Sequence, residues 1–444
     1  MSTSFSAPKK VDQEFLPILH KLVHEEYHYL APFDQRAQKQ RFYNTGKLDF
    51  EYPEAKQLSL KVQQAELDEM RTQVSNSHVP TTVKDLYQAK FVEQQKIIDI
   101  LSATSKQDDE AFHAASSSFY GTPDPKLFWV VAQQINNQFN SLIAKIDPKR
   151  KTLHRAYATW REYFQALRQP GDIGVYHLPM YNGIYIPHDY EVDSAEKIHR
   201  MFSDYLTEQN INNWVVKIAH PGERTSFGVN QSTKVISIPH DSDLSLRKRA
   251  LTKVSLQALL MHEVGVHVVR RENGDASPLA LLGVGLDDYL RAEEGIATLA
   301  EQLITGTSQY SGEVGYFSVG AAMGTLGNPL PFSELYTVLN AYYILSIADK
   351  QLETEGFYEL EELRMTATEH AWNRAVRVYR GSTGNTAGTV YTRDIIYLEG
   401  SKRMWGLLDS EAVIQPTWLV GKYDPTNPQH VAALKELEIL PQQT

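Results

Sequence analysis

The sequence predicts an α+β protein that is predominantly helical, with one small sheet beside a pair of helices. Most of its 444 residues lie in long segments whose apolar residues recur at helical spacing. Three short alternating runs interrupt these segments and are expected to be strands, at residues 214–218, 225–229 and 234–238. A chain of this length can bury a large core and is expected to contain two or three structural units.

The expected helices fall on either side of one linker. In the first part of the chain they cover residues 13–30, 55–75, 84–103, 107–118, 126–145 and 148–168. In the second part they cover residues 194–208, 241–273, 286–304, 332–353, 358–379, 390–409 and 428–438. The linker is Gln169-Pro170-Gly171-Asp172. We therefore expect a disordered tail over 1–12, an N-terminal helical region over 13–170 and a second region over 171–444.

Composition and charge narrow the possible functions. The chain has no cysteine, which excludes disulfides and thiolate metal sites. Its first residues lack the apolar core of a signal peptide, and no apolar run approaches about 18 residues, so we expect a cytoplasmic protein without a membrane span. A net charge of -10 and a pI near 5.9 argue against nucleic-acid binding. The sequence sets no oligomeric state.

The most informative segment is Met261-His262-Glu263-Val264-Gly265-Val266-His267. Two histidines with a glutamate beside the first are typical of zinc hydrolases, where imidazoles hold the ion and the carboxylate handles a proton. The zincin motif H-E-x-x-H separates its histidines by about 40° on a helix, whereas the spacing here gives about 140°. Both histidines can reach one metal only if the helix is overwound, bulged or broken, and Gly265 would ease a π-bulge. The alternative is two buried histidines on different faces of a core helix.

The next expected helix, residues 286–304, supplies a third candidate ligand. It carries Glu293 and Glu294 just ahead of Gly295 and Ala297. Two histidines from one helix and a glutamate from the next form a His₂Glu set with a fourth position open for water, as in catalytic zinc sites. The two small residues would let this helix approach the histidine helix closely. The alternative for the glutamate pair is a solvated helix face.

These motifs resemble those of the microtubule-associated tyrosine carboxypeptidase family and its bacterial relatives, some of which are described by a Q-E-G-L-A motif. The resembling segments are HEVGVH, EEGIA, the turn Phe119-Tyr120-Gly121-Thr122-Pro123, Arg380-Gly381 and the run from Tyr391 to Gly400. The resemblance extends over roughly residues 15 to 438. It implies a zincin-like peptidase catalytic region over 171–444, with Zn²⁺ bound by His262, His267 and Glu294 and with Glu263 as the catalytic glutamate. Glu293 stands where the family has glutamine, which leaves the ligand intact but makes the site more negative.

Further roles follow from the chemistry of zinc hydrolysis. Three protein ligands leave zinc able to lower the pKa of its water towards 7, and Glu263 would carry that water's proton to the leaving amine. The oxyanion needs another donor, and we choose Tyr397 because it lies in a resembling segment and adds no charge. The alternative for Tyr397 is a packed core aromatic.

Removal of a C-terminal residue also requires a partner for the free carboxylate, and arginine binds carboxylates bidentately. Arg380 and Arg393 match family positions and are preferred. Arg374 and Arg377, at helical spacing, are expected to be solvated. Asp394 is expected to orient either Arg393 or a zinc-bound histidine.

A second histidine pair competes with the main motif. His24-Glu25-Glu26-Tyr27-His28 matches H-E-x-x-H letter for letter. Against a metal role, Glu26 adds a charge inside the motif, and the chain reaches Pro32 at once, which ends the helix. We expect a structural or surface helix here.

The function predicted from the sequence is a zinc-dependent carboxypeptidase acting on a peptide or protein C-terminus. A preference for terminal tyrosine or phenylalanine rests on the resemblance alone. One alternative is a zinc hydrolase of another small amide. The other is a non-catalytic binding or regulatory protein with a structural metal, for which His220 and His240 are the nearest candidates for a fourth ligand.

Overall fold

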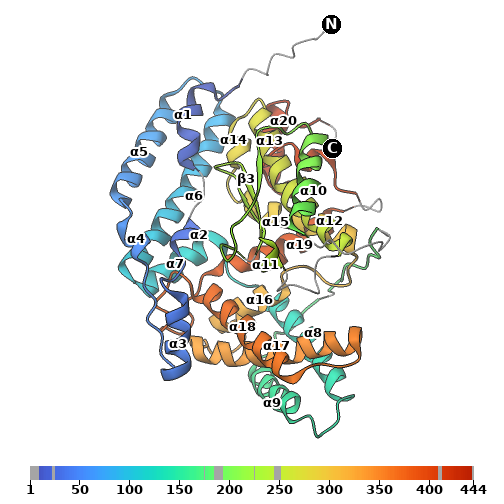
Figure 1. Cartoon of the computed structure of the whole chain (residues 1–444). Coiled ribbons are helices and arrows are strands. Elements are labelled where there is room, and N and C mark those ends of the chain that lie inside the picture. Colours follow the sequence, from blue (N-terminus) through green and yellow to red (C-terminus); the bar gives the residue numbers. More distant parts are fainter. Residues whose placement is uncertain are drawn as a thin grey trace.

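The computed structural model is predominantly helical, with a single three-stranded sheet among the residues that it describes (Figure 1). The described residues are 10–22, 26–174, 176–184, 194–224, 226–244, 252–408 and 413–442. The predicted fold class is confirmed at this level: a mostly helical chain with one small sheet. None of the described helices combines the length and apolar character needed to cross a bilayer.

The N-terminal region forms the left side of the molecule in Figure 1 and part of its base. Its elements are η1 (Gln13–Phe15), α1 (Leu16–Leu19), η2 (His20–Leu22), α2 (Glu26–Tyr29), α3 (Gln35–Thr45), α4 (Pro53–Gln57), α5 (Leu60–Asn76), α6 (Thr81–Lys106), α7 (Asp109–Tyr120), α8 (Pro125–Ile143) and α9 (Lys151–Ala166). The helix expected over 13–30 is a series of short turns, and α3 was not predicted because its sequence is almost wholly polar. Asp34 caps α3 by accepting a hydrogen bond from the Ala37 N–H at 3.1 Å.

The sheet precedes the histidine segment. It follows α10 (Ala195–Glu208) and contains β1 (Val215–Ile218), β2 (Gly228–Asn230) and β3 (Val235–Ile238). The strand order is β1-β3-β2, with β1 parallel and β2 antiparallel to β3. All three predicted strands are therefore present, and β2 lies at an edge of the sheet.

The remaining helices carry the candidate site and the lower layer of the molecule. They are α11 (Asp241–Leu244), α12 (Lys253–Leu260), η4 (Met261–Val268), α13 (Val269–Ala276), α14 (Leu281–Val284), α15 (Tyr289–Thr305), α16 (Glu313–Met323), α17 (Phe332–Glu355), α18 (Leu360–Tyr379), η5 (Thr392–Asp394), α19 (Ile395–Leu407), η6 (Pro416–Leu419) and α20 (Pro428–Glu436). The histidine helix begins at Lys253 rather than Asp241, because Thr252 caps it by accepting from the Ser255 N–H.

The expected boundary near residue 170 does not separate two cores. One hydrophobic cluster joins Phe15 and Tyr87 to Leu282 and Leu434, and the largest joins N-terminal residues such as Trp160 to the C-terminal helices α16 to α19. The packed chain also begins earlier than predicted. Asp12 was expected in a disordered tail, but it is fully buried and accepts hydrogen bonds from the Leu281 N–H and the Tyr87 hydroxyl. Residues 1–9 of that tail lie outside the described residues.

Candidate metal centre and active site

A π-helix brings the two motif histidines together. Residues Met261–Val268 form a π-helical segment between α12 and α13, so the helix widens where the sequence required a distortion. The rings of His262 and His267 lie 5.2 Å apart, centroid to centroid. A side chain at Gly265 would meet the Met261 Cε at 2.7 Å, so the glycine makes room for Met261. The prediction of a bulged helix is confirmed.

Glu294 on α15 faces both imidazoles. Its Oε2 lies 4.0 Å from Nε2 of His262 and 4.0 Å from Nε2 of His267. The three potential ligand atoms all lie within 4.8 Å of one another. Two imidazole nitrogens and a carboxylate oxygen are a donor set that suits zinc.

Among the described residues, no further histidine or carboxylate joins this three-residue group. Neither His220 nor His240 belongs to it, and His240 Nδ1 instead lies 2.9 Å from the Ser242 hydroxyl. The described part of the chain therefore offers three protein ligands and not the fourth that a closed structural site would need.

Glu293 is fully buried behind His267 rather than on a solvated face. Its Oε1 lies 2.9 Å from His267 Nδ1, and its Oε2 accepts a hydrogen bond from Arg270 at 3.2 Å. Burial alone would raise the pKa of Glu293, but Lys422, His267 and Arg270 hold it well below its usual range. The extra negative charge that Glu293 was expected to bring to the site is thus offset by two buried cations, Lys422 and Arg270.

The carboxylates around His267 also dominate its protonation. Burial works to lower the pKa of His267, but its hydrogen bond to Glu293 and the charges of Glu294 and Glu263 raise that pKa to about 9. On the other imidazole, Nδ1 of His262 lies 3.4 Å from Oε2 of Glu301. Each ring thus has a carboxylate on its Nδ1 side and has Nε2 4.0 Å from Glu294, and carboxylates so placed orient metal-bound histidines in zinc sites.

Helix α15 is fixed against α19 through two glycines. A Cβ on Gly295 would lie 2.4 Å from the carbonyl oxygen of Gly400. The small residue at 295 therefore serves the contact with α19, and not the approach to the histidine helix that we predicted. Ala297 does pack with Val266 of the π-helical segment in one hydrophobic cluster.

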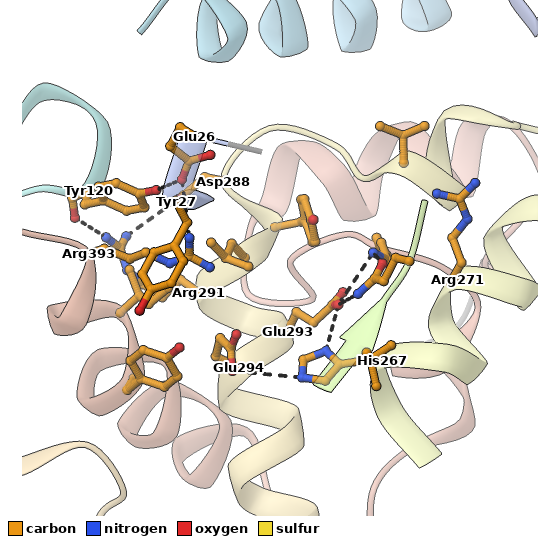
Figure 2. Close-up of a pocket in the computed structure, with 18 of the residues that line it drawn as sticks. Glu26, Tyr27, Tyr120, His267, Arg271, Asp288, Arg291, Glu293, Glu294 and Arg393 are labelled. Carbon is orange, nitrogen blue, oxygen red and sulfur yellow. Dashed lines mark hydrogen bonds and ion pairs between the residues drawn. The ribbon is translucent and has the colours of Figure 1, made fainter. Parts of the chain in front are cut away.

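A cavity of about 600 Å³ opens beside this group. The potential ligands, Glu263 and Tyr397 all line it, and so do strand β2, Arg393 and two residues of α2, Glu26 and Tyr27. Figure 2 shows Glu293 and His267 on one side of the pocket, Glu26, Tyr27 and Arg393 on the other, and Glu294 between them.

Tyr397 lies close to the potential ligands. The charge of Glu294, followed by burial, raises the pKa of Tyr397 to about 12, so its hydroxyl keeps its proton. The same hydroxyl lies 3.4 Å from the guanidinium of Arg377.

Three of the four arginines pair with two carboxylates, and the fourth lies against an aromatic ring. Arg374 and Arg377 are only partly exposed rather than fully solvated, and both pair with Asp394, at 2.8 and 2.7 Å. Asp394 therefore orients these two residues rather than Arg393 or a histidine. Arg393 lines the pocket and lies 3.3 Å from Glu26. Arg380 is 9% exposed and does not line the pocket; its guanidinium lies 3.8 Å from the ring centroid of Tyr27.

The described part of the competing histidine motif, Glu26 to His28, does not join the metal group. His24 and Glu25 lie outside the described residues. The His28 side chain is 76% exposed and lies 3.1 Å from Glu54. Glu26 and Tyr27, from the same short segment, instead line the cavity. Sequence reasoning missed both residues.

Comparison with known proteins gives one family. The family model described as "Microtubule-associated tyrosine carboxypeptidase" matches residues 217–311 and 354–444, which confirms the resemblance seen in the motifs. The matched segments contain all three potential metal ligands, Glu263 and the pocket residues Arg393 and Tyr397; residues 1–216 lie outside them. No curated protein and no solved structure matches the chain.

Proposed function

We propose that this chain, which matches the microtubule-associated tyrosine carboxypeptidase family over two segments, is a zinc-dependent carboxypeptidase acting on a peptide or protein C-terminus. One observation carries the proposal. A cavity contains two imidazoles and a carboxylate in a metal-binding arrangement, a further glutamate beside the first histidine, and an arginine and a tyrosine.

The donor set fits zinc in a catalytic setting. His262, His267 and Glu294 would hold the ion and leave a coordination position for water or substrate. Bound zinc would polarise the scissile carbonyl and make a water acidic enough to ionise near neutral pH.

The chain's own residues would supply the proton transfers. Glu263 lines the cavity next to His262, so its carboxylate can accept the water's proton and later deliver it to the leaving amine. Tyr397 remains a neutral phenol at physiological pH and can donate a hydrogen bond to the developing oxyanion. A donor that carries no charge also avoids a competing ion pair with Glu294.

The arginines provide a site for the substrate's free carboxylate. Four arginines face only two carboxylates here, Asp394 and Glu26, which leaves the cluster with a surplus of positive charge. Nε of Arg393 and both Nε and Nη1 of Arg380 are buried and have no hydrogen-bond acceptor among the described residues. Because Arg393 alone of these two lines the cavity, we assign it the direct contact with the carboxylate and assign Arg380 a supporting role.

Strand β2 supports an extended peptide as the substrate. It is an edge strand, and Gly228, Val229 and Asn230 all line the cavity. An edge strand offers unpaired backbone groups to which a peptide can add as a further strand. A peptide bound in this way would reach the potential ligands with its last residue directed to Arg393.

A preference for terminal tyrosine or phenylalanine has weaker support. The family description names tyrosine, and several aromatic side chains line the cavity, among them Tyr27, Phe119 and Tyr397. Aromatic walls favour aromatic ligands by roughly 0.5–1.5 kcal/mol per ring pair.

The test is amino-acid release by the zinc-loaded protein from peptides that differ only in their last residue, each made as the free acid and as the amide. Release of one terminal residue from the free acids, abolished by Glu263→Gln with zinc still bound, would support the proposal. Cleavage restricted to acylated amino acids would favour hydrolysis of another small amide. Tightly bound zinc with no hydrolysis of any substrate would favour the non-catalytic protein.

A further inference from the structure

Two residues of the N-terminal region lie inside the candidate active site. Glu26 and Tyr27 belong to α2, a single turn near the start of the chain, and both line the cavity that contains Glu263 and Glu294. Figure 2 shows both at the end of the pocket that holds Arg393. This turn lies outside the segments that match the family model, so the match assigns it no role.

Glu26 holds Arg393 through a buried hydrogen-bond network. Its Oε1 accepts hydrogen bonds from the Tyr120 hydroxyl at 2.5 Å, the Tyr391 hydroxyl at 3.1 Å and Arg393 Nη1 at 3.3 Å. The carboxylate is 2% exposed, and two phenols fix its position. Glu26 therefore sets where one edge of the Arg393 guanidinium lies, while Nε of Arg393 has no acceptor among the described residues.

Tyr27 lies among three guanidinium groups. Its ring centroid is 3.8 Å from Arg380, 4.9 Å from Arg393 and 5.7 Å from Arg377. Cations are attracted to an aromatic face, so one ring can keep like charges close together that would otherwise repel. Tyr27 lines the cavity and Arg380 does not, so this ring is the part of the arrangement that a substrate meets.

We propose that α2 completes the substrate site: Glu26 and Tyr27 position Arg393, with its free Nε available, to receive the terminal carboxylate of a peptide. The inference rests on the proposed carboxypeptidase function. Glu26 and Tyr27 are positioning residues, because they act through Arg393 rather than on the reacting atoms.

The experiment measures binding instead of turnover. In a Glu263→Gln background, zinc-loaded protein is titrated with a fluorescent hexapeptide ending in tyrosine, as the free acid and as the amide. The ratio of the two Kd values reports recognition of the carboxylate. Tyr27→Ala is expected to reduce the preference for the free acid about 10-fold, whereas Tyr27→Phe, which keeps the ring, retains it. Glu26→Ala is expected to act in the same direction as Tyr27→Ala.

His28→Ala is the matched control, because His28 lies on the same turn with an exposed side chain that does not line the cavity. It should leave both Kd values and the zinc content unchanged. If Glu26→Ala fails to fold, the contrast between Tyr27→Ala and Tyr27→Phe still decides whether α2 contributes to recognition of the carboxylate.

A parent protein that prefers the free acid, together with a Tyr27→Ala variant that prefers it equally, would overturn this inference alone. Loss of the preference in His28→Ala would overturn it as well. If the parent binds neither peptide, the proposed function fails and the inference fails with it.

Discussion

Glu293 lies 2.9 Å from Nδ1 of His267 and at the same time accepts a hydrogen bond from Arg270, 3.2 Å away. One carboxylate thus orients a potential metal ligand and neutralises a buried cation. The first contact directs Nε2 of His267 toward Glu294. The second ties α15 to Arg270 on α13, and the Arg270 guanidinium also donates to the carbonyl groups of Gly421 and Tyr423. Orientation of the ligand and packing of the fold therefore depend on the same side chain.

This dual contact predicts that Glu293→Ala weakens zinc binding by about 10- to 100-fold, as expected when the outer partner of a metal-bound histidine is lost. Glu293→Gln keeps an acceptor for Nδ1 and should lose less than about 10-fold. Both variants leave Arg270 and Lys422 without their carboxylate, so both should unfold at a lower temperature than the wild type. Competition with a fluorescent chelator gives the affinities; equal affinities for the two variants would contradict the orienting role.

The two histidine motifs make opposite predictions about metal content. We expect one zinc per chain in the wild type. His262→Ala or His267→Ala leaves two potential ligands, and elemental analysis should then find no bound zinc. His28→Ala should keep it, because that side chain is exposed and pairs with Glu54. If zinc were lost from His28→Ala and retained in His267→Ala, the metal would belong to the N-terminal motif that contains His28, and the assignment to His262 and His267 would be wrong.

The contact between α15 and α19 predicts that Gly295→Ala is destabilising. The added methyl group would meet the backbone of Gly400 at 2.4 Å, and a backbone atom cannot move aside as a side-chain end can. We expect a loss of about 1–3 kcal/mol in the free energy of unfolding, with weaker zinc binding because Glu294 moves with α15. Gly406→Ala on α19 is the matched control, since nothing lies within 4 Å of its added Cβ, and it should be neutral or stabilising by up to about 1 kcal/mol. Urea denaturation with both variants tests this; equal stabilities would contradict it.

The sequence predicted the local chemistry of the site better than its long-range contacts. The spacing of His262 and His267 required a distorted helix, and the π-helical segment supplies it. The strands were visible because alternation is a local pattern. The contact between Glu26 and Arg393 joins residues 367 positions apart, and no periodicity reports such a pair.

Ion pairs between separate elements were the second source of error. Arg374 and Arg377 were expected to be solvated, and a solvated face was the alternative for Glu293, because charged side chains are usually found there. In the fold each has a partner of opposite charge, and those partners come from other elements of the chain: Arg270 and Lys422 for Glu293, and Asp394 for the two arginines. A pairing of this kind depends on how helices pack, which the composition of one helix does not determine.

The Asp394 cluster predicts a stability effect with a defined pH range. Burial works to raise the pKa of Asp394, but Arg377 and Arg374 outweigh it and hold that pKa below its ordinary value. A carboxyl whose pKa is lower in the folded than in the unfolded chain stabilises the fold above its unfolded pKa of about 4, and this contribution is lost as the pH falls through the lower folded value.

Asp394→Asn should therefore cost about 3 kcal/mol at pH 7, because it leaves two arginines without their carboxylate. The difference from wild type should stay constant down to about pH 5 and shrink below about pH 4. Urea denaturation across this range measures it, with Glu361→Gln, from an exposed ion pair with Arg364, as a control expected to change stability by less than about 0.5 kcal/mol. A difference that already shrinks between pH 7 and pH 5 would contradict the lowered pKa of Asp394.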